Sequence, residues 1–265
     1  MLDINDLSFS YKDRKILENI VLNGRNDRVI SILGPNGVGK TTLLKCMCNI
    51  LKPEAGVVMV SGTDISGYSG RELAKQMSYV PQRSQATRVL VFDAVLIGRR
   101  PHMEWSAGKK DLDITWDAIR VMGLEDLALR YVDEISGGEF QKVIIARAIV
   151  QEPKVLILHE PTNNLDVSNH HLTLHLIADT VRHRQICTIM TMHDINLATH
   201  YSDELIFMKD GHIMKHGGLE IIDRELIKEV YGLEADIIQH EGIPFVIPKK
   251  MHHKPVELMH SHPHD

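Results

Sequence analysis

Short apolar runs alternate with amphipathic segments along most of the chain. Four continuous runs rich in β-branched residues predict buried strands at 29–33, 154–158, 185–191 and 204–208. Weaker patterns predict further strands at 2–9, 57–60 and 77–80. Helical periodicity covers the segments 42–47, 111–150 and 173–181. Strands alternating with helices predict an α/β fold with a mostly parallel sheet covered on both faces.

A helical block interrupts this alternation between about residues 85 and 150. Within it, one predicted apolar helix face carries Ile114, Ala118, Val121 and Met122. A second helix covers the apolar residues that follow position 142. The block therefore predicts an α-helical subdomain inserted into the sheet-containing core.

A glycine-rich segment directly follows the strand predicted at 29–33. It consists of Gly34, Pro35, Asn36, Gly37, Val38, Gly39, Lys40, Thr41 and Thr42. Glycines let the backbone curl so that successive N–H groups point at phosphate oxygens, and the helix beginning at Lys40 adds its positive end. Lys40 can reach the β- and γ-phosphates of a nucleotide, and the Thr41 hydroxyl can ligate Mg²⁺. A tight turn that binds nothing is the alternative, which the complete pattern between strand and helix disfavours.

Composition narrows the class of protein. The formal net charge of −5 argues against a general nucleic-acid binder, and 5% aromatic residues leave few platforms for stacking bases. No apolar run approaches the roughly 20 residues that span a bilayer, and the acidic N-terminus does not resemble a signal peptide. The three cysteines show no metal-type pairing and are expected to be reduced. We therefore expect a cytoplasmic protein.

The chain changes character after about residue 232. Apolar pairs on either side of Glu241-Gly242 predict a hairpin within a C-terminal extension, 233–265. The last fifteen residues include five histidines: His252, His253, His260, His262 and His264. A metal-binding tail is one interpretation, and a solvated terminus is the favoured one.

Four further segments carry a more specific signal, in this order: Tyr79–Gln82, Ile135–Gln141, Ile157–Asp166 and Thr191–Asp194. With the glycine loop they resemble the nucleotide-binding subunit of ATP-binding-cassette (ABC) transporters over residues 1–232. The Ser-Gly-Gly-Glu sequence distinguishes this family from other NTPases, because a phosphate loop alone occurs in many of them. The resemblance implies a P-loop NTPase core with a mostly parallel sheet, an N-terminal antiparallel β portion and an inserted α-helical subdomain.

The resemblance also implies a site shared between two copies of the chain. Ser136, Gly137, Gly138 and Glu139 would bind the γ-phosphate of ATP held by the opposite copy, and Asp166 would link the two ATP sites. A helix N-terminus with glycines is a suitable anion site. Ser136 and Glu139 also form a good capping box, and both roles are compatible.

Other site residues follow the same resemblance. Glu160 ends a predicted strand, where it could act as general base toward the attacking water, and its alternative role is a surface turn residue. Gln82 resembles the glutamine that contacts Mg²⁺ and this water, and His193 the histidine that touches the γ-phosphate. Tyr11 resembles the aromatic residue that stacks on adenine. The implied metal-site residues are Thr41, Gln82 and the residue before Glu160.

That last position departs from the family pattern. The family has an aspartate there that holds Mg²⁺ through water, whereas this chain has His159. Mg²⁺ prefers oxygen ligands, and imidazole suits softer metals. A neutral His159 could still accept a hydrogen bond from a Mg²⁺-bound water. We therefore expect ATP binding with weaker Mg²⁺ affinity and slower turnover than is usual in the family.

One segment points to a class of transporter. Residues 95–102 resemble the ATPases of importers for iron–siderophore, haem and cobalamin. The group implies a homodimer on the cytoplasmic face of the membrane, bound to permease subunits and through them to a substrate-binding protein. We expect the permease to dock around residues 83–105, with Arg99 and Trp105 as contacts. The alternatives are a soluble assembly ATPase of the same fold and an ATP-binding clamp that does not hydrolyse.

Overall fold

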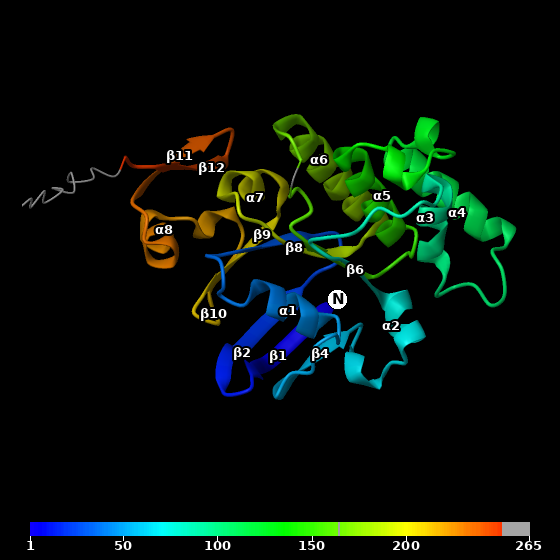
Figure 1. Cartoon of the computed structure of the whole chain (residues 1–265). Coiled ribbons are helices and arrows are strands. Elements are labelled where there is room, and N and C mark those ends of the chain that lie inside the picture. Colours follow the sequence, from blue (N-terminus) through cyan, green and yellow to red (C-terminus); the bar gives the residue numbers. More distant parts are fainter. Residues whose placement is uncertain (164, 251–265) are drawn as a thin grey trace, which may run out of the picture.

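A six-stranded sheet organises the molecule, and the computed structural model describes residues 1–163 and 165–250 (Figure 1). The five histidines of the C-terminal tail and Asn164 lie outside the described residues. The strands lie in the order β10 (His212–Gly217), β9 (Glu204–Lys209), β3 (Val29–Leu33), β8 (Cys187–Thr191), β7 (Val155–His159) and β6 (Met77–Val80). All neighbours pair in parallel except β9 with β10. The mostly parallel sheet is confirmed.

An antiparallel sheet formed mainly by the N-terminal part of the chain packs near the first one. Its order is β2 (Arg14–Gly24), β1 (Leu2–Tyr11), β4 (Ala55–Val60) and β5 (Thr63–Asp64). The sequence pattern did not predict β2. The β1–β2 pairing has register shifts, and Asn19 has a left-handed φ of 50°, so inward residues do not keep a strict alternation.

Helices cover both faces of the six-stranded sheet. Along β7, Val155 and Ile157 pack into one core with α1 (Lys40–Met47) and the antiparallel sheet, while Leu156 and Leu158 pack into a second core. The second core is formed with these helices: α3 (Val91–Leu96), α4 (Lys109–Val121), α5 (Gly137–Ile149), α6 (Val167–Arg184), α7 (Ile195–Tyr201) and α8 (Arg224–Tyr231). Alternate side chains of one strand thus face two cores, which explains the continuous apolar runs.

Two boundaries differ from the sequence prediction. The strand predicted from residue 185 begins at Cys187, because Gln185 takes a left-handed conformation at the end of α6. Val121, predicted on the buried face of its helix, is 40% exposed at the last position of α4. A further helix, α2 (Gly70–Gln76), precedes β6. None of the described helices has the length and apolar character to cross a membrane.

The predicted C-terminal hairpin is present as β11 (Ala235–His240) and β12 (Ile243–Pro248). Glu241 and Gly242 form its turn, both at positive φ. Ala235 and Val246 face inward and belong to the same core as α7 and α8. The hairpin is therefore packed against the body of the molecule.

The structure corrects one expectation about the helical block, which was that Arg99 contacts a partner. Arg99 is 2% exposed, and its guanidinium bonds Asp111 Oδ1 at 3.0 Å, Glu152 Oε2 at 2.7 Å and the Val150 carbonyl at 2.8 Å. These contacts join the first turn of α4 to the segment after α5. Arg99 is a structural residue, whereas Trp105 is 94% exposed.

We expect Arg99→Ala to lower the free energy of unfolding by about 3 kcal/mol, because it leaves a buried carbonyl and two carboxylates without their donor. Arg88→Ala is the matched control, since the Arg88–Asp133 pair is exposed and such pairs contribute at most about 1 kcal/mol. Chemical denaturation measures both. Equal effects of the two substitutions would contradict a structural role for Arg99.

Candidate functional site

Four predicted site segments meet at one edge of the six-stranded sheet. The glycine loop follows β3, Glu160 follows β7, His193 lies two residues after β8, and Gln82 lies two residues after β6. These four strands are parallel and adjacent, so their carboxyl ends share one edge (Figure 1). Ligand sites of α/β sheets lie at this edge.

The glycine loop has the backbone geometry that its sequence predicts. Gly34 has a φ of 147°, and a Cβ there would collide with the Met208 carbonyl. Lys40 Nζ donates to the carbonyls of Gly34 at 2.6 Å and Pro35 at 2.9 Å, which places the ammonium under the loop. Burial lowers the pKa of Lys40, and the nearby Glu160 carboxylate opposes that shift. The loop, helix α1 and the ammonium form a site suited to phosphate.

A cavity of about 290 Å³ opens beside this loop. Its lining includes Asn36, Gly37 and residues 39–42 of the loop, Arg14 and Ile16 of β2, and Glu160. Tyr11 pairs with Arg14 across the β1–β2 hairpin, is 47% exposed and packs edge-on against Phe9. The β2 strand, which the sequence pattern missed, thus supplies one wall of the cavity.

Glu160 is the centre of a hydrogen-bond network within this edge. Its Oε1 lies 2.6 Å from His193 Nε2, and its Oε2 accepts from Gln82 Nε2 and, at 3.1 Å, from Asn163 Nδ2. Glu160 is 9% exposed, so a charged carboxylate here requires such donors. The structure brings together Gln82, Glu160 and His193 from three different strand ends.

The backbone of Glu160 is held in an unusual conformation. Its φ is 51°, in the left-handed region that non-glycine residues rarely adopt. Its N–H donates to the hydroxyl of buried Thr191 on the neighbouring strand at 3.1 Å. Sequence reasoning missed Thr191 and Asn163 as contributors. Thr191 ends a predicted strand and Asn163 follows Glu160 closely, but neither position signals which group it contacts.

His159 lies between Glu160 and the glycine loop. Its Nε2 is 3.0 Å from Thr41 Oγ1 and 3.8 Å from Glu160 Oε1. Burial lowers the pKa of His159, and the Glu160 carboxylate opposes this, so the environment favours the neutral imidazole. The oxygens of Thr41 and Gln82 fit a Mg²⁺ ion that accompanies a nucleotide. The imidazole does not fit as a direct ligand of that ion, because it offers nitrogen where Mg²⁺ prefers oxygen.

The Ser-Gly-Gly-Glu segment begins helix α5, away from the cavity lining. Ser136 and Glu139 form the predicted capping box, and hydrogen bonds from Ser136 lower the pKa of Glu139. Asp166 caps α6 by accepting from Asn169 N at 2.8 Å, and that bond lowers its pKa. Gly138 lies close to the Asn169 side chain: a Cβ added to Gly138 would be 3.3 Å from it. Ser136 and Asp166 thus belong to neighbouring helix starts.

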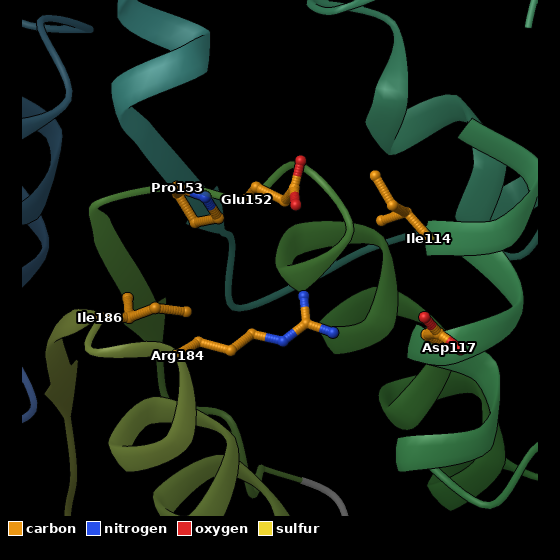
Figure 2. A pocket seen from close by; sticks show the side chains of 6 residues that line it. All are labelled: Ile114, Asp117, Glu152, Pro153, Arg184 and Ile186. Carbon is orange, nitrogen blue, oxygen red and sulfur yellow. The ribbon is translucent and has the colours of Figure 1, made fainter. Parts of the chain in front are cut away.

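A second cavity, of about 340 Å³, lies at the opposite edge of the sheet, near the starts of β7 and β8. Figure 2 shows Arg184 extending across it between Pro153 and Ile186 on one side and Asp117 on α4 on the other. None of the predicted site residues lines this cavity. The candidate site is therefore the cavity beside the glycine loop.

The fold and the site define a P-loop nucleotide-binding protein with an α/β core. Residues 17–163 match the family described as ABC transporter. The chain belongs to this family, as an ATP-binding subunit. The fold class predicted from the sequence is thereby confirmed.

Relatives place the chain within the family. It is 49% identical to an uncharacterized ABC transporter ATP-binding protein of Methanocaldococcus jannaschii, over 94% of this chain and 98% of the relative. It is 35% identical to the hemin import ATP-binding protein HmuV of Gloeobacter violaceus, over 94% of each chain. Other relatives are import ATP-binding proteins for petrobactin, iron(3+)-hydroxamate and cobalamin. The predicted resemblance to this importer group is confirmed.

A solved structure agrees with this placement. The structure of cbiO1 from Clostridium perfringens, part of the ABC transporter complex cbiONQ, aligns with a TM-score of 0.77. The two chains are 30% identical, and the alignment covers 86% of this chain and 93% of cbiO1.

We expect Thr191→Val to lower the free energy of unfolding by about 1–3 kcal/mol, because the buried Glu160 N–H loses its acceptor. Thr188→Val on the same strand is the matched control. The Thr188 hydroxyl is fully buried and has no hydrogen-bond partner among the described residues, so its removal is expected to be neutral or stabilising. Thermal or chemical unfolding of both variants measures the difference. The expectation is wrong if Thr191→Val is as stable as the control.

Proposed function

We propose that the chain is the ATP-hydrolysing motor of an importer and that Glu160 acts as its general base. The observation that carries the proposal is the network that holds Glu160 between Gln82 and His193, on the sheet edge that also bears Lys40. A carboxylate near the phosphate loop is suited to take a proton from a water that attacks the γ-phosphate.

The other residues of the edge have complementary tasks in this proposal. The loop N–H groups and Lys40 hold the phosphates and stabilise their charge. His193, which lies beside Glu160, donates a hydrogen bond to the γ-phosphate and thereby orients it. Gln82 donates to Glu160 through Nε2, which leaves its oxygen for a water or a cation. Mg²⁺, when bound with ATP at Thr41 and Gln82, would neutralise charge on the β- and γ-phosphates.

Two copies of the chain complete each site in this proposal. Ser136, Gly137 and Gly138 present a helix N-terminus of thirteen-residue α5, and none of them lines the cavity beside their own glycine loop. Such an N-terminus attracts anions. Binding the γ-phosphate of a second copy gives these groups a ligand and makes dimerisation depend on ATP. Asp166, at the neighbouring helix start, would then lie near the joint between the two sites.

The role of Ser136 in the shared site can be tested by comparing it with Ser69, because both serines belong to capping boxes of the same form. Ser69 and Glu72 cap α2 as Ser136 and Glu139 cap α5, each with a glycine after the serine. We expect Ser69→Ala and Ser136→Ala each to cost about 1 kcal/mol of stability. Only Ser136→Ala should weaken ATP-dependent dimerisation and reduce hydrolysis, by about tenfold or more.

Sedimentation with and without ATP, in the Glu160→Gln background that slows turnover, measures dimerisation. Hydrolysis is measured separately, in the purified wild-type chain and in the two serine variants that keep Glu160. If ATP causes no dimerisation, or if both serine variants lower it equally, the shared site is refuted.

We further infer that His159 lowers the Mg²⁺ affinity of the ATP site. The neutral imidazole bonds the Thr41 hydroxyl, the same hydroxyl that would bind the ion. An aspartate at this position would supply oxygen and negative charge next to the cation. His159→Asp is therefore expected to lower the Mg²⁺ concentration for half-maximal ATPase activity about tenfold, and to raise the rate at limiting Mg²⁺.

His212→Asp is the control for the charge change, since His212 is exposed at the start of β10. If His159→Asp is no faster than wild type at limiting Mg²⁺, the inference about the metal site fails. The wild-type chain would instead be a non-hydrolysing clamp if it dimerises with ATP without hydrolysing it and only the His159→Asp variant hydrolyses ATP.

The transported substrate and the membrane partner are proposals from the relatives. Hemin, petrobactin, iron(3+)-hydroxamate and cobalamin are the substrates in the relatives' names, so we propose import of a metal chelate through permease subunits and a substrate-binding protein. Trp105 is exposed and remains part of the proposed docking surface, whereas buried Arg99 is left out of it. The proposed location is the cytoplasmic face of the membrane. A polytopic partner that co-purifies distinguishes this motor from an assembly ATPase.

A further inference from the structure

The C-terminal hairpin is tied to helix α7 by a pair of reciprocal hydrogen bonds. The Asn196 amide donates through Nδ2 to the Val246 carbonyl at 3.2 Å, and its Oδ1 accepts from the Val246 N–H at 2.8 Å. The two residues are 50 positions apart in the chain. The α7 and β12 elements also share a core that includes Ala198 and Val246.

This contact satisfies the backbone groups of one residue at the free edge of a two-stranded sheet. Among residues 1–163 and 165–250, β12 pairs with β11 alone, and Val246 lies opposite Ile237 in that pairing. The backbone N–H and C=O of Val246 that bond Asn196 belong to the other edge of β12, where none of these described residues forms a further strand. A primary amide offers a donor and an acceptor in one plane, so the Asn196 side chain replaces one residue of a neighbouring strand. Leucine has a similar size and offers neither group.

Asn196 is also part of the turn that carries His193. The Asn196 N–H donates to Asp194 Oδ1 at 2.8 Å, and the Leu197 N–H donates to the same oxygen at 3.0 Å. These bonds begin α7 immediately after His193. His193 Nε2 in turn lies 2.6 Å from Glu160 Oε1, although the His193 side chain is 48% exposed. Because about half of the His193 side chain is exposed, the orientation of the ring depends on its contact with Glu160 and on its own backbone.

We propose that Asn196 is a positioning residue for the ATP site, and that the C-terminal hairpin orients His193 through it. The path consists of the hairpin backbone at Val246, the Asn196 amide, the Asp194-capped turn and the His193 ring. This inference rests on the proposed hydrolytic function, and it assigns to the hairpin a part in that function. The bonding partner of His193 at the far end of the path is Glu160.

Asn196→Leu removes both hydrogen bonds and keeps a side chain of similar size. We expect its kcat for ATP to fall about tenfold to a hundredfold, as for displacement of a reacting group by about 1 Å, with ATP affinity within twofold of wild type. Asn196→Asp keeps the acceptor for the Val246 N–H but turns a second acceptor toward the Val246 carbonyl, so its kcat should fall as well. Gln239→Leu, the same kind of change at an exposed position on β11, should leave kcat unchanged.

A spectroscopic measurement separates positioning from loss of stability. The imidazole ¹⁵N signals of His193, identified by their absence in His193→Gln, should shift in Asn196→Leu and stay in place in Gln239→Leu. Thermal unfolding of each full-length variant reports whether the hairpin still packs.

Three outcomes would overturn the proposal: unchanged kcat in folded Asn196→Leu, unchanged His193 signals in that variant, or equal effects of Gln239→Leu. A wild-type chain without ATPase activity would refute the proposed function instead. The His193 signals would then decide the positioning role by themselves, so the two failures are distinguishable.

Discussion

The hydrogen bonding of one nearly buried carboxylate constrains the arrangement of the whole site. Glu160 is 9% exposed, and an ionised carboxylate at such a position is stable only when donors replace the water it loses. Those donors come from Gln82 after β6, His193 after β8 and Asn163 in the turn after Glu160 itself. The order of strands β6, β7 and β8 in the sheet is therefore a chemical requirement of the site as well as a result of core packing.

The same requirement explains why the backbone departs from ordinary geometry here. Glu160 takes a left-handed φ, and the hydroxyl of Thr191 on the adjacent strand binds its N–H. Strained residues persist where their surroundings determine them strongly, and they concentrate at functional sites. The nucleotide loop shows a related constraint, since only glycine fits at position 34 beside the Met208 carbonyl. Both features lie at the carboxyl edge of the sheet, beside the cavity.

Local patterns and long-range contacts differed in how well they could be predicted. The glycine loop, the strand-end position of Glu160 and the capping box at Ser136 depend on a few consecutive residues, and the structure has them where the sequence predicts them. The predicted partner contact at Arg99 was wrong, because an arginine beside apolar residues has the same pattern whether it faces a partner or a buried carbonyl. Strand β2 was missed, because its register shifts remove the strict alternation on which strand prediction depends.

The sequence by itself determined the class of fold, the phosphate-binding loop and the types of side chain at the strand ends. These follow from periodicity and from short motifs whose chemistry is local. Only the tertiary structure decided which groups meet: Thr191 with Glu160 across 31 positions, Asn196 with Val246 across 50, and His159 with Thr41 across 118. Such contacts depend on strand order and on the packing of distant segments, and one segment's pattern carries no information about its distant neighbours.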